Sequence, residues 1–591
     1  MVKLRDKKGD PYVVVKERLA RETGTIFKDH GGRLSVALLY PNVYEVGMSN
    51  LGFQKIYHLL NLRDDVVCER AFLPSKPETE FLRKHRQTIT SMESNRPLNE
   101  FDIIAFSITF EMDYINVLAM LALASVSLRK RGKRVPLVVA GGVAVTMNPE
   151  PLAPFMDIMF IGEGEGIINP FVDKAIEYGS GDLSNFASVP GAYIPSAYTP
   201  IFKQDGTIEK IDAQNGFPEK IKRVWDIDYR LTPNVSRVET PDTVFGDMSL
   251  VEIGKGCGKH CRFCAAGYVY RPTRHADIGA IETAIDDALE KKGKVGLVGS
   301  AIADHPYVER LFEYIITKGG VFSVSSLRLD KLTDNMLHWL TLSMERGGSH
   351  TITVAPEAGT ERLRRITNKD ISDETILDTM KRVAAAGPFR LKLYFIVGLP
   401  GETMDDVKGI VDLVARIREA MAPEWKKRGR DEVITVGVDG FVPKPATPYQ
   451  WEPFEGVKAV AEKLNLVARG LRSVPRVAIH PGSARQGYIQ ALLSIGDRRV
   501  TDMLENAYRL GGDWSKVFRE SDIDPDFFVT RRKETDETLP WSIIDHGLRD
   551  DYLARELKLA DKGKLTKECP PPDEPCRRCG EFPGVCVPKN L

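Results

Sequence analysis

From about residue 34 onward, short apolar runs alternate with amphipathic segments. SVALLY (35–40), FDIIAFSITF (101–110), VPLVVAGG (135–142) and FMDIMFIGEGEG (155–166) are typical of buried strands, and segments at 49–61 and 114–128 have helical spacing. This alternation predicts a doubly wound, Rossmann-like parallel sheet that binds ligands at the carboxyl ends of its strands. The loops at those ends are SITFEM, GGVAVTMNPEP and GEGEG, whose glycines permit close approach of backbone to ligand.

A second alternation begins at Met248. Six apolar runs are predicted as strands, at 249–254, 295–300, 321–330, 350–359, 391–403 and 433–445, and amphipathic helices separate them. The helix after the fifth run, for example, places Val407, Ile410, Val414 and Ile417 on one face. Six β/α units make three-quarters of a TIM-like barrel, in which the chemistry lies at the carboxyl ends of the strands.

The whole chain is therefore predicted to be α/β, with a Rossmann-like domain, a partial (β/α)6 TIM-like barrel, a helix-rich C-terminal region and a cysteine-rich tail. The predicted boundaries are an N-terminal arm at 1–33, the Rossmann-like domain at 34–180, a connecting segment at 181–245, the barrel at 246–455, the helical region at 456–560 and the tail at 561–591.

Composition narrows the class of protein. Lys and Arg total 82 and Asp and Glu total 82, so no global field draws the chain to nucleic acid or to an anionic membrane. A mild basic excess after residue 456 is typical of a solvated face and leaves nucleic-acid binding undecided. No apolar run is long enough to span a bilayer, and the N-terminus has no signal-peptide pattern. We therefore expect a cytoplasmic protein without a membrane partner.

Three of the eight cysteines, Cys257, Cys261 and Cys264, lie in the run GKGCGKHCRFCAAG. Three thiolates on one loop can hold three irons of a [4Fe–4S] cluster and leave the fourth iron open to a small molecule. The apolar Phe263 would shield such a cluster from water. The alternative is a zinc site of three cysteines completed by His260 or His275.

Four further cysteines crowd the tail, at Cys569, Cys576, Cys579 and Cys586. Clustered cysteines in a cytosolic chain indicate metal rather than disulfides. Four thiolates suit either zinc or a second [4Fe–4S] cluster, and the sequence leaves both open. The remaining cysteine, Cys68, is expected to be a small buried side chain on a strand.

With these motifs in view, the chain resembles the radical SAM superfamily. More narrowly, it resembles radical SAM proteins with an N-terminal cobalamin-binding-like domain, and among them a poorly characterised bacterial subgroup with a cysteine-bearing tail. The segments that carry the resemblance are YPNVYEVGMSNLGFQ, VVAGGVAVTMNPEPL, EIGKGCGKHCRFCAAGYVYRPTR, VAPEAGTERLRRITNK, LKLYFIVGLPGET and FVPKPATPYQW.

The resemblance implies that the open iron binds S-adenosylmethionine through its amino and carboxylate groups. One-electron reduction then cleaves the sulfonium C–S bond and yields a 5′-deoxyadenosyl radical, which abstracts hydrogen from a substrate carbon. A flavodoxin or a ferredoxin is the expected reducing partner. No catalytic residue in contact with the substrate is assigned, and the substrate itself is not readable from the sequence.

The resemblance also implies supporting residues for S-adenosylmethionine. They are Glu357 after the fourth strand, Gly398, Gly401 and Glu402 in the GLPGET motif, and Ser325, Ser326 and Arg328 at the third strand. Three of these charges have simpler interpretations. Glu357 and Arg328 could form an ion pair at the barrel rim, and Glu402 could be the acidic residue that favours a helix start. VGSAIAD, after the second strand, lacks the usual acidic pattern.

Cobalamin binding stays open. The loop PNVYEVGMSNLG contains no histidine to ligate cobalt, so the N-terminal domain either binds cobalamin without one or only positions substrate. If cobalamin binds, methyl transfer to an unactivated carbon is the leading reaction. The alternatives are RNA or protein modification of the methylthiotransferase type, and a non-catalytic iron–sulfur scaffold.

Overall fold

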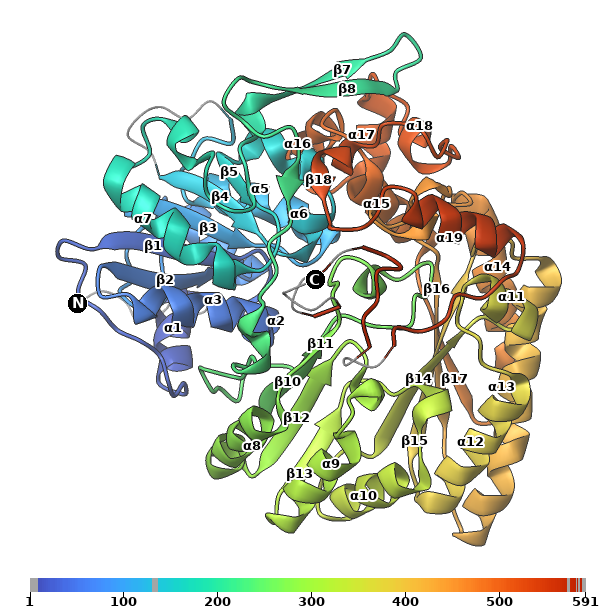
Figure 1. The fold of residues 1–591 in the computed structure, drawn as a ribbon. Coiled ribbons are helices and arrows are strands. Elements are labelled where there is room, and N and C mark those ends of the chain that lie inside the picture. The colour runs from blue at the N-terminus through green and yellow to red at the C-terminus, as the bar shows by residue number, and fades with distance from the viewer. Residues whose placement is uncertain (1–8, 130–135, 571–573, 581, 583–584, 587–591) are drawn as a thin grey trace.

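The computed structural model describes residues 9–129, 136–570, 574–580, 582 and 585–586. Figure 1 shows an N-terminal sheet domain in blue, a barrel-like body in green to orange, and a group of C-terminal helices in red. The tail returns to the middle of the molecule, between the sheet domain and the barrel. Within the described part of the chain, no helix has the length and apolar content needed to cross a membrane.

The N-terminal sheet has the strand order β2-β1-β3-β4-β5-β6, and only β6 is antiparallel to its neighbour. This is the flavodoxin-like order of doubly wound folds, so the predicted fold class is confirmed here. The strands are β1 (Leu34–Tyr40), β2 (Val66–Phe72), β3 (Ile103–Ser107), β4 (Leu137–Gly141), β5 (Ile158–Phe160) and β6 (Ala192–Tyr193). The helices of this part are α1 (Pro11–Leu19), α2 (Tyr44–Gly47), α3 (Leu51–Leu62), α4 (Lys76–His85), α5 (Tyr114–Leu123), α6 (Val143–Met147) and α7 (Ile168–Tyr178).

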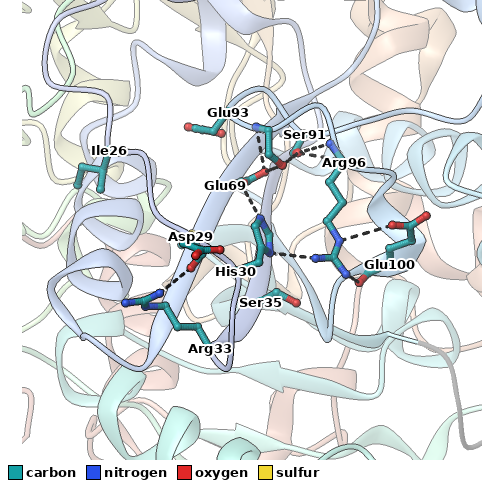
Figure 2. Close-up of polar contacts among 12 residues, drawn as sticks. Ile26, Asp29, His30, Arg33, Ser35, Glu69, Ser91, Glu93, Arg96 and Glu100 are labelled. Atoms are coloured by element: carbon teal, nitrogen blue, oxygen red, sulfur yellow. Dashed lines mark hydrogen bonds and ion pairs between the residues drawn. The ribbon is translucent and has the colours of Figure 1, made fainter.

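The described part of the N-terminal arm covers β2, the edge strand of this sheet. His30 of the arm contacts the carboxylate of Glu69 at 2.8 Å, and Arg96 donates to the other ring nitrogen of His30 at 3.1 Å (Figure 2). Arg33 ties the arm to itself by donating to the carbonyl of Asp29. A polar cover of this kind protects an edge that would otherwise offer unpaired backbone groups to another chain.

Next to this cover, Arg70 of β2 is 1% exposed and bonds two carboxylates. Its guanidinium contacts Glu22 of the arm at 2.6 Å and Glu93 at 2.7 Å. Both carboxylates are as buried as Arg70 itself. The arm is therefore held through paired charges in the interior, where removal of one member leaves the others uncompensated.

Residues 181–245 contain short strands and turns, and β6 within them belongs to the N-terminal sheet. β7 (Tyr198–Phe202) and β8 (Ile208–Ala213) form a hairpin, and β9 (Ile221–Lys222) pairs with β18 (Ile544–Asp545) from near the end of the chain. The segment LPWSIIDHG (539–547), which contains β18, therefore packs against the connecting segment.

The barrel strands follow in the predicted order. They are β10 (Ser249–Lys255), β12 (Lys294–Gly299), β13 (Val321–Val324), β14 (Thr351–Glu357), β15 (Arg390–Val397) and β16 (Ile434–Gly440), with the short β11 (Arg274–His275) antiparallel to β10. The helices between and after them are α8 (Ile278–Lys292), α9 (Val308–Thr317), α10 (Asp334–Glu345), α11 (Glu361–Ile366), α12 (Asp373–Ala386) and α13 (Met404–Lys427). Along β14 and β15 buried and more accessible positions alternate, because one face packs on helices and the other faces the barrel interior.

Two features go beyond the six predicted units. The strands form two hydrogen-bonded sheets, β11-β10-β12-β13 and β14-β15-β16-β17, and Leu327 N–H donates to the Thr353 carbonyl at 3.0 Å between them. A seventh parallel strand, β17 (Val477–Pro481), pairs with β16 inside the region predicted to be helical. It was missed because VAIHP is short, incompletely buried and ends in proline.

The C-terminal helices pack on both larger bodies. They are α14 (Val457–Arg472), α15 (Ala484–Ile495), α16 (Val500–Arg509), α17 (Trp514–Glu520), α18 (Asp526–Val529) and α19 (Tyr552–Asp561). Arg498 bonds the buried Glu150 of the sheet domain at 3.0 Å, and Lys444 after β16 bonds Glu111 at 2.6 Å. The first ion pair joins the sheet domain to the C-terminal helices, and the second joins it to the barrel.

Candidate functional site

The predicted cysteine loop starts directly after β10, at the carboxyl end of the first barrel strand. Gly256 enters the loop with φ +77°, and a Cβ there would lie 2.6 Å from the carbonyl oxygen of Tyr270. Only glycine fits this position, because both the backbone conformation and the neighbouring backbone exclude a side chain. The loop returns through β11, so its two ends are joined as neighbouring strands.

The three loop cysteines are shielded from solvent. Cys261 is buried, and Cys257 and Cys264 are partly buried. Burial and the nearby Cys261 and Cys264 raise the pKa of Cys257 to about 12, and burial and Cys261 raise that of Cys264 to about 11. As free thiols they stay protonated at neutral pH, so a metal must displace their protons to bind.

The spacing of the three sulfurs tests which metal fits. Sulfurs on one tetrahedral zinc lie about 3.8 Å apart, given Zn–S bonds of about 2.3 Å. Within the described ranges, the only three ligand atoms within 4.8 Å of one another belong to Glu163, Glu165 and Asp226. The loop sulfurs are therefore wider apart than a single zinc requires. A cluster in which each thiolate binds its own iron accepts wider spacing, so the residues fit a [4Fe–4S] cluster.

Charged residues of the third and fourth strands face this loop. Glu357 and Arg328 do not pair with each other: Lys369 bonds Glu357 at 3.1 Å, and Asp330 bonds Arg328 at 2.9 Å. Glu357 has φ +70° at an irregularity in the β14–β15 register. Such a conformation is strained for glutamate, and bulges of this kind re-aim side chains next to functional sites.

The GLPGET motif forms a tight loop after β15. Gly398 and Gly401 both have φ near +80°, at +78° and +79°, which glycine adopts without strain. Glu402 folds back on this loop, accepts from the Gly398 N–H at 2.6 Å and pairs with Lys463 at 2.8 Å. Helix α13 is capped instead by Thr403 and Asp406. Glu402 thus shapes the loop and does not serve as the helix-start acid.

The remaining predicted positions lie at the third strand. Ser325 and Ser326 are exposed after β13, and Ser325 lines the large cavity described below. One acidic group was missed in VGSAIAD. Asp304 bonds Lys259 of the cysteine loop at 3.2 Å, and its Oδ2 has no hydrogen-bond partner among the described residues. An acid five residues after Gly299, rather than next to it, was the available signal.

A cavity of about 780 Å³ lies between the sheet domain and the barrel. All three predicted loops at the carboxyl ends of the N-terminal strands contribute to its wall, through Ser107, Gly142 and Glu163 among others. The barrel contributes residues from β10, β12 and β13, and Lys255 and Val269 flank the cysteine loop. The volume is in the upper part of the range of ligand sites, about 300–1,000 Å³.

The cavity has a polar end that sequence reasoning did not find. Glu252 accepts from the side-chain amide of Asn234 at 2.7 Å, and burial raises the pKa of Glu252 to about 7. Asn234 is 4% exposed, and its Oδ1 has no partner among the described residues. These positions lie on different elements, so only the fold brings them together.

The acidic group Glu163, Glu165 and Asp226 lies at the same end. Lys255 bonds both glutamates at 3.2 Å, and Arg274 bonds Glu163 at 2.5 Å. Lys255 and Arg274 hold the pKa of Glu163 at about 2 against the effect of burial. The group is an ion-pair network in which two cations offset two of the three carboxylate charges, so most of its negative charge is already paired.

The tail reaches the cysteine loop. Cys569 N–H donates to the Gly258 carbonyl at 2.9 Å, and a Cβ on Gly258 would lie 3.2 Å from the Cβ of Cys569. Glu568 pairs with Lys259 at 2.5 Å. His260, one alternative zinc ligand for the loop, has its Nε2 at 3.6 Å from the sulfur of Cys569, a cysteine of the tail.

This fold and this cysteine loop are typical of iron–sulfur enzymes that use S-adenosylmethionine. Comparison with known families agrees. Residues 251–414 match the radical SAM superfamily, and residues 52–195 match the family described as radical SAM proteins, N-terminal. The chain belongs to the radical SAM superfamily, and the predicted resemblance is confirmed. The family implies a [4Fe–4S] cluster and S-adenosylmethionine as cofactors.

Two curated relatives differ in what they cover. An uncharacterized protein of Methanocaldococcus jannaschii is 26% identical over 475 residues, which are 80% of this chain and 90% of the relative. The tRNA-2-methylthio-N(6)-dimethylallyladenosine synthase of Mycobacterium bovis is 24% identical over 264 residues, which are 41% of this chain and 50% of that enzyme.

Solved structures give a looser likeness. The cobalamin-dependent S-adenosylmethionine radical enzyme OxsB with aqua-cobalamin bound is 14% identical, with a TM-score of 0.43 over 66% of this chain and 53% of that chain. The radical S-adenosylmethionine methyltransferase TsrM from Kitasatospora setae, with tryptophan and a SAM analog bound, is 12% identical, with a TM-score of 0.44 over 68% and 72%.

Proposed function

We propose that Cys257, Cys261 and Cys264 hold the catalytic [4Fe–4S] cluster and that S-adenosylmethionine binds beside it. When bound, the cluster supplies the electron that breaks the sulfonium C–S bond of S-adenosylmethionine and gives a 5′-deoxyadenosyl radical. The observation that carries the proposal is the position of the loop, at the carboxyl end of β10 and flanked by residues of the large cavity.

The protein's own residues bind, orient and exclude water. Glu357 and Lys369 present opposite charges near Cys264, and they suit the amino and carboxylate groups of the methionine part. Arg328 approaches Cys261 from the third strand and adds a second cation. Gly398 and Gly401 allow a flat adenine to approach the backbone, in a loop held by Glu402 and Lys463.

We further propose that the cavity holds a corrinoid together with the substrate and that the reaction is methyl transfer. The size of the cavity is compatible with this, because about 780 Å³ is in the upper part of the range of ligand sites. The wall supports it as well, since it is formed by the carboxyl ends of a flavodoxin-like sheet, where such folds bind cofactors. No histidine is needed in the PNVYEVGMSNLG loop if cobalt takes no protein ligand.

The second candidate is RNA modification of the methylthiotransferase type. It is favoured by the likeness to the tRNA synthase from Mycobacterium bovis, which covers half of that enzyme. A second metal site in the tail, holding either zinc or a cluster, is compatible with both reactions.

Anaerobic reconstitution separates a radical SAM enzyme from a non-catalytic iron–sulfur scaffold. The protein reduced with flavodoxin or dithionite should release 5′-deoxyadenosine from S-adenosylmethionine, and Cys261→Ala should not. A Cys261→Ala protein that still forms this product refutes the cluster assignment. No product from the wild-type protein favours a scaffold.

The corrinoid is tested with a variant that fills the cavity. Ser107→Phe should abolish the corrinoid absorption of the reconstituted protein while its iron content stays unchanged, because Ser107 lines the cavity and is not in the cysteine loop. Ser184→Phe, at an exposed position that does not line the cavity, is the matched control. An absent corrinoid spectrum in the wild-type protein contradicts methyl transfer through cobalamin.

A further inference from the structure

Arg271 is the buried cation that joins the tail to the cysteine loop. It is 1% exposed, and its Nη1 donates to the sulfurs of Cys569 at 3.3 Å and Cys579 at 3.2 Å. Among the described residues, no carboxylate pairs with it. A buried guanidinium without an anion is strongly unfavourable, so its partners must supply negative charge. Metal-bound cysteines do so because they bind as thiolates.

His260 lies beside one of these sulfurs, that of Cys569. Arginine has no acceptor, so the contact of 2.7 Å between Arg271 Nη2 and His260 Nδ1 makes Nδ1 the acceptor. Nε2 lies 3.2 Å from the same Nη2 and 3.6 Å from the sulfur of Cys569. Arg271 and His260, both from the segment that contains the loop cysteines, therefore lie at sulfurs of the tail.

The four tail cysteines also lie close to one another. Cys576 N–H donates to the Cys586 carbonyl at 2.8 Å, and Arg271 Nη1 bonds the sulfurs of both Cys569 and Cys579. No three of the tail sulfurs lie within 4.8 Å of one another in the described part of the chain. Like the loop sulfurs, they are too far apart for one zinc and suit a cluster with one thiolate on each iron.

We propose that Cys569, Cys576, Cys579 and Cys586 hold a second [4Fe–4S] cluster and that it passes electrons to the cluster of the cysteine loop. The relay rests on the proposed function of that loop. A reduced flavodoxin or ferredoxin, a low-potential donor, loses one electron. The electron enters at the tail cluster and then reduces the loop cluster. No atom or proton is transferred in this step. Contact between Cys569 and Gly258, the neighbour of Cys257, provides the short path.

The tail cluster is tested without any turnover. The triple variant Cys257→Ala, Cys261→Ala, Cys264→Ala should retain about four irons per chain and a paramagnetic signal on reduction. The matching variant Cys576→Ala, Cys579→Ala should retain only the loop cluster. Cys68→Ala, at a buried cysteine outside both sets, should retain both. One zinc, or no metal, in the triple variant overturns the proposal.

The relay needs a comparison of electron donors. In Cys576→Ala, Cys579→Ala, reduction of the loop cluster by reduced flavodoxin should be at least an order of magnitude slower than in the wild-type protein, while reduction by dithionite is retained. Equal flavodoxin rates in both proteins overturn the relay. A wild-type protein that forms no 5′-deoxyadenosine sinks the proposed function instead, and leaves the metal analysis of the triple variant standing.

Arg271 gives an independent readout. Hydrogen bonds and positive charge at the sulfurs stabilise a reduced cluster, so Arg271→Gln should lower the midpoint potential of the tail cluster. Arg271→Lys, which keeps the charge, should restore part of it. An unchanged potential in Arg271→Gln contradicts the assigned contacts. If Arg271→Gln does not fold, the cysteine variants still decide the proposal.

Discussion

Gly256 is a position where one added methyl group would cause both backbone strain and a steric clash. In Gly256→Ala the new Cβ would lie 2.6 Å from the Tyr270 carbonyl oxygen, at φ +77°. The left-handed conformation alone costs alanine about 1–2 kcal/mol, and overpacking against rigid neighbours adds typically about 1–3 kcal/mol. We therefore expect Gly256→Ala to lower the free energy of unfolding by about 2–5 kcal/mol and to distort the entrance to the cysteine loop.

Gly293→Ala is the matched control. Gly293 has φ +67° at the end of α8, and no atom lies within 4 Å of the Cβ that would be added. It should show only the conformational cost of about 1–2 kcal/mol. Iron per chain after reconstitution and the thermal midpoint of the apoprotein measure the two effects. Gly256→Ala should lose loop iron and Gly293→Ala should not. Equal behaviour of the two variants would refute the steric argument.

Two other changes test charges in the interior. Glu252 keeps its proton in the folded protein up to a pKa of about 7, whereas it ionises near 4.5 when unfolded, so its contribution to stability falls as pH rises from about 4.5 to about 7, by on the order of 3 kcal/mol. Glu252→Gln should therefore gain on the wild-type thermal midpoint across this window, and a constant difference would contradict the burial. Arg70→Met should lose about 3–5 kcal/mol because Glu22 and Glu93 are left unpaired, and the partly exposed Arg96→Met should lose under about 1 kcal/mol; similar thermal midpoints for the two variants would falsify this.

The chemistry of the loop could be predicted because its information is local. Cys257, Cys261 and Cys264 lie in one short segment, and the apolar run before them predicts the strand that precedes the loop. The contacts of Arg271 could not, because its partners Cys569 and Cys579 are about 300 residues away and no periodicity links them.

The same limit explains the smaller differences. Glu402 was predicted to support S-adenosylmethionine, with a helix-start acid as the alternative, and its partner Lys463 comes from the next helix. Glu357 and Arg328 share the barrel rim, yet each has a nearer counter-charge, Lys369 and Asp330. Strand β17 depends on pairing with β16 rather than on its own short pattern. Sequence identifies which groups are present, and tertiary structure decides which of them meet.

The contact between the tail and the cysteine loop has a consequence for the order of biosynthesis. Arg262 is fully buried, and its guanidinium donates to the carbonyls of Ile366 and Lys564. About 300 residues separate the loop from that second partner, so synthesis at about 5–20 residues per second leaves roughly 15–60 s before the cover exists. We expect iron delivery to the loop to be easiest in that interval, while the nascent barrel is still open.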